Sequence, residues 1–151
     1  MKLLLIHKFG YISNIDIIRI GLILLVVISG NYKWFSPEMM YVYELTVNSW
    51  LSFLPDLLGK TGVSYFLAVF QALTGVVLLA GFVFPLAGVT GTFLVILSSA
   101  TMLSIIGYGY NSESLSLVIK EVMILSSGLI TLINDLAILK IDNQHSAHVG
   151  R

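Results

Sequence analysis

Four long apolar runs decide the solvent in which this chain can fold. They cover about residues 15–33, 63–84, 86–106 and 115–133. Each is close to the roughly 20 residues that an α-helix needs to cross a bilayer at about 1.5 Å per residue. Hydrophobic residues make up 57% of the chain and charged residues 11%, which is outside the range of soluble domains. We therefore expect an all-α integral membrane protein built as a four-transmembrane-helix bundle.

The connections between the runs predict one domain. Pro85 alone separates the second run from the third, so these two should form an antiparallel hairpin. Asn134 and Asp135 follow the fourth run and are expected to end it. With no internal repeat and no linker, we predict a single membrane domain over residues 1–135 and a polar cytoplasmic tail over residues 136–151.

A more polar segment joins the first two runs. Ser36, Pro37 and Glu38 are typical of a helix start, with an N-cap residue, a proline in the first turn and a carboxylate near the helix N-terminus. Apolar side chains then recur at spacings of three and four beside a polar stripe. This pattern predicts an amphipathic helix over residues 37–54 that lies at the membrane interface and is ended by Pro55.

Basic residues beside the runs predict the orientation, because cytoplasmic loops carry an excess of lysine and arginine. Four of them fall on the side of the two termini and two on the other side. We therefore expect a multi-pass protein of the bacterial inner membrane with both termini cytoplasmic. The basic residues compared are Lys2, Lys8, Lys140 and Arg151 against Lys33 and Lys60.

Composition excludes several classes of function. Eight basic and eight acidic residues give a formal net charge of zero, so no field attracts nucleic acid. The absence of cysteine excludes disulfides and iron–sulfur clusters. No histidine falls in an apolar run, which excludes a haem held by two histidines inside the membrane; His145 and His148 lack a third metal ligand nearby. The lipid bilayer is the expected partner, and a homo-oligomer or another membrane protein remains open.

Seven polar residues are candidates for a polar interior or binding site. Ionisable groups inside a span cost about 2.5 to 3.5 kcal/mol on insertion scales and often mark solute or proton paths. Adjacent charges in the fourth run point about 100° apart on a helix, so each should find a partner elsewhere. The candidates are Lys33, Glu38, Glu44, Asn48, Gln71, Lys120 and Glu121.

Simpler structural roles compete with this interpretation. Lys33 could anchor the end of the first span at the headgroups, and Arg19 is expected to do the same at its start. Glu44 and Asn48 fit a solvated helix face. Gln71 could make an interhelical hydrogen bond to one of the two charges of the fourth run, worth about 0.6 kcal/mol.

The segment after the first run resembles a known family. Gly30, Lys33, Glu38, Asn48 and Ser49 have the spacing found in the YkgB/RclC-like inner-membrane proteins. This family is linked to reactive-chlorine resistance and is distantly similar to DoxX-type four-helix membrane proteins. The resemblance covers residues 15–133. Further matches are Leu78, Leu79, Thr101, Ser104 and the pair Lys120 and Glu121, where the family has Lys-Asp.

The chain also departs from the family pattern. Gln71 stands where the family has a glutamate, and Ser116 stands where an arginine is expected. The loss of two opposite charges together suggests a hypothesis, that relatives carry an ion pair between the second and fourth spans. Pro37 and Glu44 replace the family's tyrosine and proline, which affects the helix between the first two spans.

These observations lead to one leading hypothesis and two alternatives. The resemblance implies an inner-membrane protein related to reactive-chlorine stress, and the polar residues suggest that it binds or moves a small solute. The sequence shows no phosphate loop, no Ser-His-Asp set and no paired carboxylates in a soluble cleft, so we expect a protein that is not an enzyme. The alternatives are a quinone-binding or redox-partner membrane subunit and a structural scaffold bundle in a larger complex.

Overall fold

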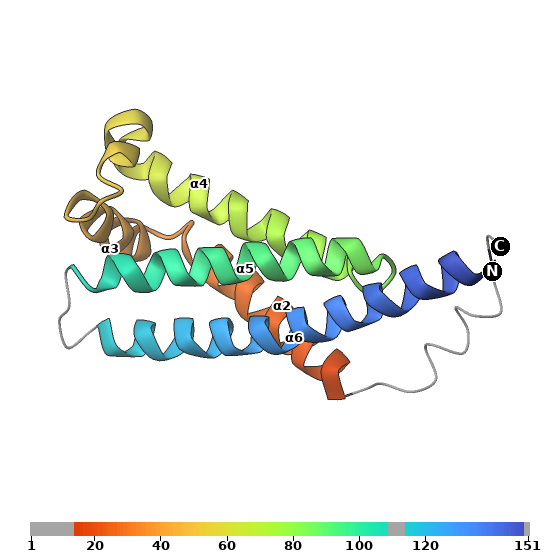
Figure 1. Cartoon of the computed structure of the whole chain (residues 1–151). Coiled ribbons are helices and arrows are strands. Elements are labelled where there is room, and N and C mark those ends of the chain that lie inside the picture. The colour runs from red at the N-terminus through yellow and green to blue at the C-terminus, as the bar shows by residue number, and fades with distance from the viewer. Residues whose placement is uncertain (1–13, 109–113, 150–151) are drawn as a thin grey trace.

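The computed structural model describes residues 14–108 and 114–149, and all the regular structure in these residues is helical (Figure 1). Lys2, Lys8 and most of the connection between the third and fourth spans lie outside the described residues, as do the side chains of His145 and His148. The helices are α2 (Asn14–Tyr32), α3 (Ser36–Val47), α4 (Phe53–Ala80), α5 (Pro85–Ile106) and α6 (Ser114–Val149).

Four of these helices are long and apolar enough to cross a membrane. They are α2, α4, α5 and the part of α6 from Leu115 to Lys140. This confirms the predicted all-helical class and the four long apolar helices. The bounds of α2 and α5 also agree with the predicted spans to within one residue.

The four long helices form a closed ring of neighbours. Helix α2 packs against α4 and α6, and α5 packs against the same two helices. The short helix α3 lies against α4 and touches α5 at one end of the bundle (Figure 1). The α4–α5 hairpin lies at the other end, beside the start of α2. We call these the α3 end and the hairpin end.

The bundle places many polar side chains inside and large apolar side chains outside. Leu24, Leu73, Phe93 and Ile133, one from each long helix, are all more than half exposed. This arrangement suits a bundle surrounded by lipid, because lipid tails solvate an apolar surface and polar groups then find partners between helices. An apolar core cluster still fills the middle, and its buried residues are Leu22, Ile23, Val26, Leu78, Val95 and Ile124.

Two buried stripes of residues face each other along α2 and α6. Both have spacings of three and four, which keep residues on one face of a helix. The two helices are antiparallel, because the start of α2 meets the later part of α6 and the end of α2 meets its earlier part. The stripe of α2 is Arg19, Leu22, Val26, Ser29 and Lys33. The stripe of α6 is Glu121, Ile124, Gly128, Thr131 and Asp135.

Helix α3 is shorter than predicted, because it ends at Val47 and the next helix begins at Phe53. Local hydrogen bonds from side chains end it. The Asn48 amide donates to the Glu44 carbonyl at 2.9 Å, and the Ser49 hydroxyl donates to the Thr46 carbonyl at 2.9 Å. Such bonds offer the backbone an alternative to continuing the helix.

The proline expected to end this helix instead lies in the next one. Pro55 is in the first turn of α4, where the missing N–H has no helical partner to lose. The buried residues of α3 are Val42, Leu45 and Thr46. Of the predicted apolar stripe, Met40 and Val47 are exposed, whereas Leu51 after the helix packs against the core.

Two more boundaries differ from expectation. The second span was predicted to begin at about residue 63, but α4 begins at Phe53 and has one break at Gly59, where φ is 73°. Helix α6 continues past Asp135 to Val149 rather than ending there. It continues because the Asp135 carboxylate pairs with Arg19 inside the bundle, so this charge does not mark the edge of the membrane.

Candidate functional site

Lys33 lies inside the α3 end of the bundle rather than at the headgroups. Only 1% of its surface is exposed. Its amine lies 3.5 Å from the Ser29 carbonyl, and its own carbonyl accepts a hydrogen bond of 2.8 Å from the Ser64 hydroxyl of α4. The turn after α2 is therefore bound to α4, and this holds the lysine side chain in the interior.

Burial changes the acidity of this lysine. The pKa of Lys33 is lowered from 10.5 to about 8, mainly because burial disfavours the charged form and also because Lys120 is positively charged. The negative charges of Glu38 and Glu121 raise this pKa in part. Lys33 can therefore exchange a proton at a pH much nearer to neutral than an exposed lysine does.

The adjacent charges of α6 both reach the interior. The Lys120 amine donates a hydrogen bond of 3.1 Å to the Ser29 hydroxyl, so it finds a partner on another helix, as predicted. The same amine lies 3.6 Å from the Glu121 carboxylate, so the two adjacent charges also pair with each other, which differs from the expectation that each finds its partner elsewhere. Glu121 is 2% exposed. Lys33, Ser29, Lys120 and Glu121 thus form a continuous series, which we call the polar chain.

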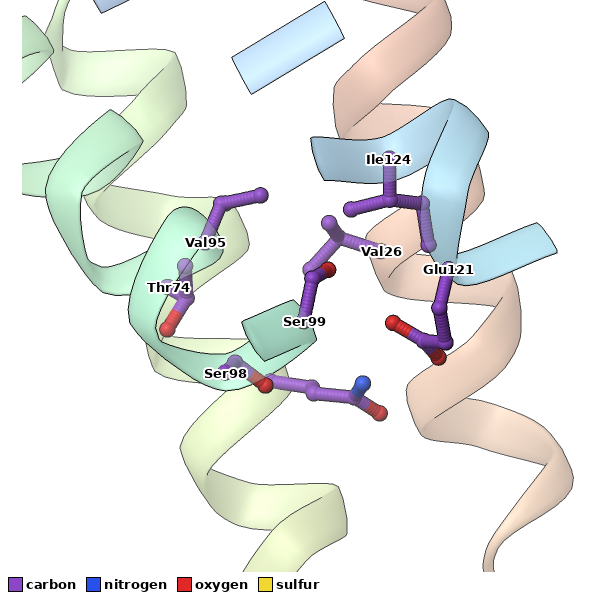
Figure 2. A pocket seen from close by; sticks show the side chains of 8 residues that line it. Val26, Thr74, Val95, Ser98, Ser99, Glu121 and Ile124 are labelled. Carbon is purple, nitrogen blue, oxygen red and sulfur yellow. The ribbon is translucent and has the colours of Figure 1, made fainter. Parts of the chain in front are cut away.

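The polar chain ends at a small cavity in the middle of the bundle. Its volume is about 10 Å³, the space that one water molecule needs. In Figure 2, Ser98 and Ser99 of α5 lie across from Glu121 of α6. All four long helices contribute to the lining, which consists of Val26, Gln71, Thr74, Val95, Ser98, Ser99, Glu121 and Ile124.

Two buried oxygens at this cavity have no hydrogen-bond partner among the described residues. They are Oε1 of Gln71 and Oε1 of Glu121. We expected Gln71 to hydrogen-bond Lys120 or Glu121 directly. The structure instead places Gln71 and Glu121 at one cavity, with neither Oε1 in a hydrogen bond, although the Lys120 amine lies 3.6 Å from Oε1 of Glu121. Such oxygens are costly in a low-dielectric interior and indicate where a small donor would bind.

The other three candidate residues lie on or near α3. Glu38 is half-buried in its first turn and acts on Lys33 through its charge. Glu44 and Asn48 are exposed, and the Asn48 amide bonds to the Glu44 carbonyl rather than to the interior. The structure therefore brings Lys33, Gln71 and the two α6 charges together and leaves Glu44 and Asn48 outside.

A second charged cluster lies at the hairpin end, where sequence reasoning placed only an interfacial anchor. Arg19 is 4% exposed and pairs with Asp135 across α2 and α6. Its guanidinium also donates to the Gly81 carbonyl at 3.0 Å and lies 5.2 Å from the centre of the Phe82 ring. Both residues belong to the buried stripes of their helices, which the structure reveals.

Comparison with known proteins adds no further constraint. No family model, curated protein or solved structure matches the chain. The resemblance to the YkgB/RclC-like proteins therefore stays a prediction. Among the described residues, no three histidine or acidic side chains lie together as metal ligands would.

Proposed function

We propose that this chain is a membrane protein that binds or moves a small polar solute through the interior of its bundle. The polar chain carries this proposal. It links a lysine at the α3 end to a carboxylate at a cavity in the middle, between helices whose outer faces are apolar. Placing such groups in a membrane is costly, and ionisable groups inside membrane bundles often mark solute or proton paths.

The polar chain would form one half of a path. It runs from Lys33 at the α3 end to the cavity at Glu121. Beyond the cavity, the apolar core cluster separates it from the hairpin end. A path through the bundle therefore requires the helices to move, because Lys33 and Glu121 are both buried in this structure.

The distribution of basic residues also suggests where the protein lies. We propose that the protein lies in a bacterial inner membrane with both termini cytoplasmic, which places the α3 end outside the cytoplasm. Helix α3 would lie at the membrane interface, with the exposed Met40, Val47 and Trp50 in contact with lipid. Lys33 would then receive solute from the outer side.

The physiological role rests on the resemblance alone. Its test is survival of hypochlorite by a deletion strain that carries wild type or the variant Lys33→Gln or Glu121→Gln. The matched controls are Lys60→Gln and Glu44→Gln, which change the same residue types at exposed positions. We expect rescue by wild type and both controls, and loss of rescue by the two interior variants at equal membrane levels.

Two results would refute this role. Absence of rescue by wild type would exclude the reactive-chlorine function, and equal rescue by all variants would exclude the polar chain as the working site. Quinone extracted with the purified protein would instead support the quinone-subunit alternative. A partner protein that is required for the bundle to accumulate would support the scaffold alternative.

A further inference from the structure

The cavity in the middle of the bundle has acceptors that can take a further hydrogen bond. Oε1 of Gln71 on α4 and Oε1 of Glu121 on α6 make no hydrogen bond with the described residues. The two residues are only 7% and 2% exposed, so bulk water does not reach them. The Lys120 amine pairs with Oε1 of Glu121 at 3.6 Å, which is longer than a hydrogen bond, and this oxygen can still accept a donor.

Donors line the same cavity. They are the side-chain amide of Gln71 and the hydroxyls of Ser98 and Ser99, and a hydroxyl can also accept. Figure 2 shows the two serines of α5 across the cavity from Glu121 of α6. A molecule held here is therefore offered acceptors and donors from three helices.

A close approach of α2 holds Gln71 at this position. A Cβ added at Gly30 would lie 3.1 Å from Cβ of Gln71 and 3.6 Å from its Oε1. The glutamine side chain is thus confined by the backbone of α2 on one side and lines the cavity on the other.

The volume of the cavity limits its occupant to one small molecule. About 10 Å³ is the space that a single water molecule needs. A buried water typically makes about three hydrogen bonds to otherwise unsatisfied polar groups, and the glutamine, the glutamate and the two serines can supply them. Ammonia has nearly the same size and also both donates and accepts hydrogen bonds.

The charges around the cavity favour a neutral occupant. Lys33 experiences the charges of Lys120, Glu38 and Glu121, so this group holds two cations and two anions. The lining residues of α4 and α5 carry no charge, and the ion pair at the hairpin end is balanced as well. An ion in the cavity would have no counter-charge left to pair with, which is costly in a low-dielectric interior.

We propose that this cavity binds a single neutral molecule of the size of water that both donates and accepts hydrogen bonds, either water itself or ammonia. This inference rests on the proposed function and deepens it. The small polar solute of the bundle is then a neutral molecule rather than an ion.

Nuclear magnetic resonance of the protein in lipid nanodiscs tests whether the cavity is occupied. Isotope-labelled glutamine marks two side chains, Gln71 and Gln144, and the variant Gln71→Leu identifies the signal of the first. We expect a cross-relaxation peak between the Gln71 amide protons and water, with the sign of a close contact rather than of proton exchange. Absence of this peak in wild type overturns the proposal, because the Gln71 amide then bonds directly to Glu121 or to nothing.

Two variants separate a bound molecule from the serine hydroxyls, whose exchanging protons resonate at the frequency of water. In a Ser98→Ala background, Ser99→Ala removes the hydroxyl and keeps the space, whereas Ser99→Val fills the space. The peak should persist in the first variant and be lost in the second. Ser126→Val is the matched control and should keep the peak, because Ser126 is exposed on α6. Loss of the peak in both Ser99 variants overturns the proposal.

Flux into proteoliposomes identifies the class of solute. Light scattering after an osmotic step reports water, a pH-sensitive dye inside the vesicles reports ammonia, and a potassium-sensitive dye reports an ion. We expect faster entry of water or ammonia with wild type and Ser126→Val than into protein-free liposomes, and loss of this increase with Ser99→Val. The molecule that enters faster is the solute.

The outcomes distinguish this inference from the proposed function. Potassium entry that is lost in Glu121→Gln overturns the neutral solute, although movement of a solute then stands. The water peak without flux of any of the three probes refutes movement through the bundle, whereas the binding site then stands. Absence of both the peak and the flux refutes both.

Discussion

The two ends of the bundle interior use buried charges in different ways. At the hairpin end, one cation meets one anion, and Arg19 also bonds to the Gly81 carbonyl and stacks on Phe82. At the α3 end, the amines of Lys33 and Lys120 share Ser29 and one buried carboxylate. The first end is one directly bonded ion pair, whereas at the second end the nearest opposite charges, Lys120 and Glu121, are 3.6 Å apart beside a small cavity.

This difference separates structural from functional charges. The same two stripes of α2 and α6 supply both ends, so helix position alone does not distinguish them. What distinguishes them is direct contact and the cavity. A directly bonded pair fixes the register of two helices, while charges that lie beside a cavity can act on a bound species. Each prediction below tests this distinction.

The largest effect is expected from breaking the balanced pair. Asp135→Asn leaves the Arg19 guanidinium buried without its counter-charge, which costs about 3 to 5 kcal/mol of stability. Replacing both residues, with Arg19→Met and Asp135→Leu, should recover most of this loss. Unfolding in mixed micelles with increasing sodium dodecyl sulfate, followed by circular dichroism, measures both. A cost below about 1 kcal/mol for the single variant would show that the pair does not hold the hairpin end together.

At the α3 end we expect a stability that depends on pH. The pKa of Lys33 is about 8 in the folded protein and 10.5 as the ordinary value. Between these values the unfolded chain holds a proton that the folded chain has released, so stability rises with pH through this window. Below pH 8 the folded protein bears the full cost of burying the Lys33 ammonium. This cost lowers the free energy of unfolding by roughly 3 kcal/mol.

Lys33→Met removes this dependence. The stability of wild type minus that of Lys33→Met should be lower at pH 7 than at pH 10. Thermal unfolding in detergent measures this difference. The variant Lys60→Met serves as control, because Lys60 is exposed and lies over the Tyr43 ring. An identical pH profile for wild type and Lys33→Met would mean that the buried amine is not destabilised by its surroundings.

A smaller effect is expected at Gly88, where α5 passes the ion pair. A Cβ added at this position would lie 2.7 Å from an Asp135 carboxylate oxygen. Gly88→Ala should therefore displace the carboxylate and cost about 1 to 3 kcal/mol. Gly21→Ala is the matched control, since a Cβ there meets nothing within 4 Å. Equal stability of the two variants in the same unfolding assay would argue that the carboxylate can move freely.

The smallest effect is expected at Ser29. Ser29→Ala removes the hydroxyl that accepts the hydrogen bond from Lys120 but keeps the backbone carbonyl near Lys33. The loss should be about 0.5 to 1.5 kcal/mol. Ser126→Ala is the control, because its exposed hydroxyl bonds to the Val122 carbonyl of its own helix. The same unfolding assay should show this loss in Ser29→Ala and no loss in the control.

The sequence was sufficient for the large features of the fold. Long apolar runs predict four spanning helices because each must satisfy its backbone hydrogen bonds internally. The ends of the helices were harder to predict. Asn134 and Asp135 resemble a helix terminus until Arg19 is known to be the partner of the Asp135 carboxylate. In the same way, Arg19 near the start of a span is indistinguishable from an anchor. Only the tertiary contact between them removes both ambiguities.

The candidate site was predicted in part for a similar reason. Charges within apolar runs, such as Lys120 and Glu121, are visible in any sequence. Ser29 was not singled out, because a serine in a span is common and only its position between two amines gives it a role. Glu44 and Asn48 were included because they follow a polar stripe, but that stripe faces away from the bundle.

The break in α4 at Gly59 also determines how the bundle fits its bilayer. The complete helix, Phe53–Ala80, would be about 42 Å long, whereas residues 60–80 span about 31 Å. The second length matches a hydrocarbon core of about 30 Å. Figure 1 shows the first turns of α4 set at an angle to the rest. A substitution at Gly59 that made the helix straight would add about 11 Å to the span. The resulting hydrophobic mismatch is one that a membrane relieves by tilting the helix or by thickening around it.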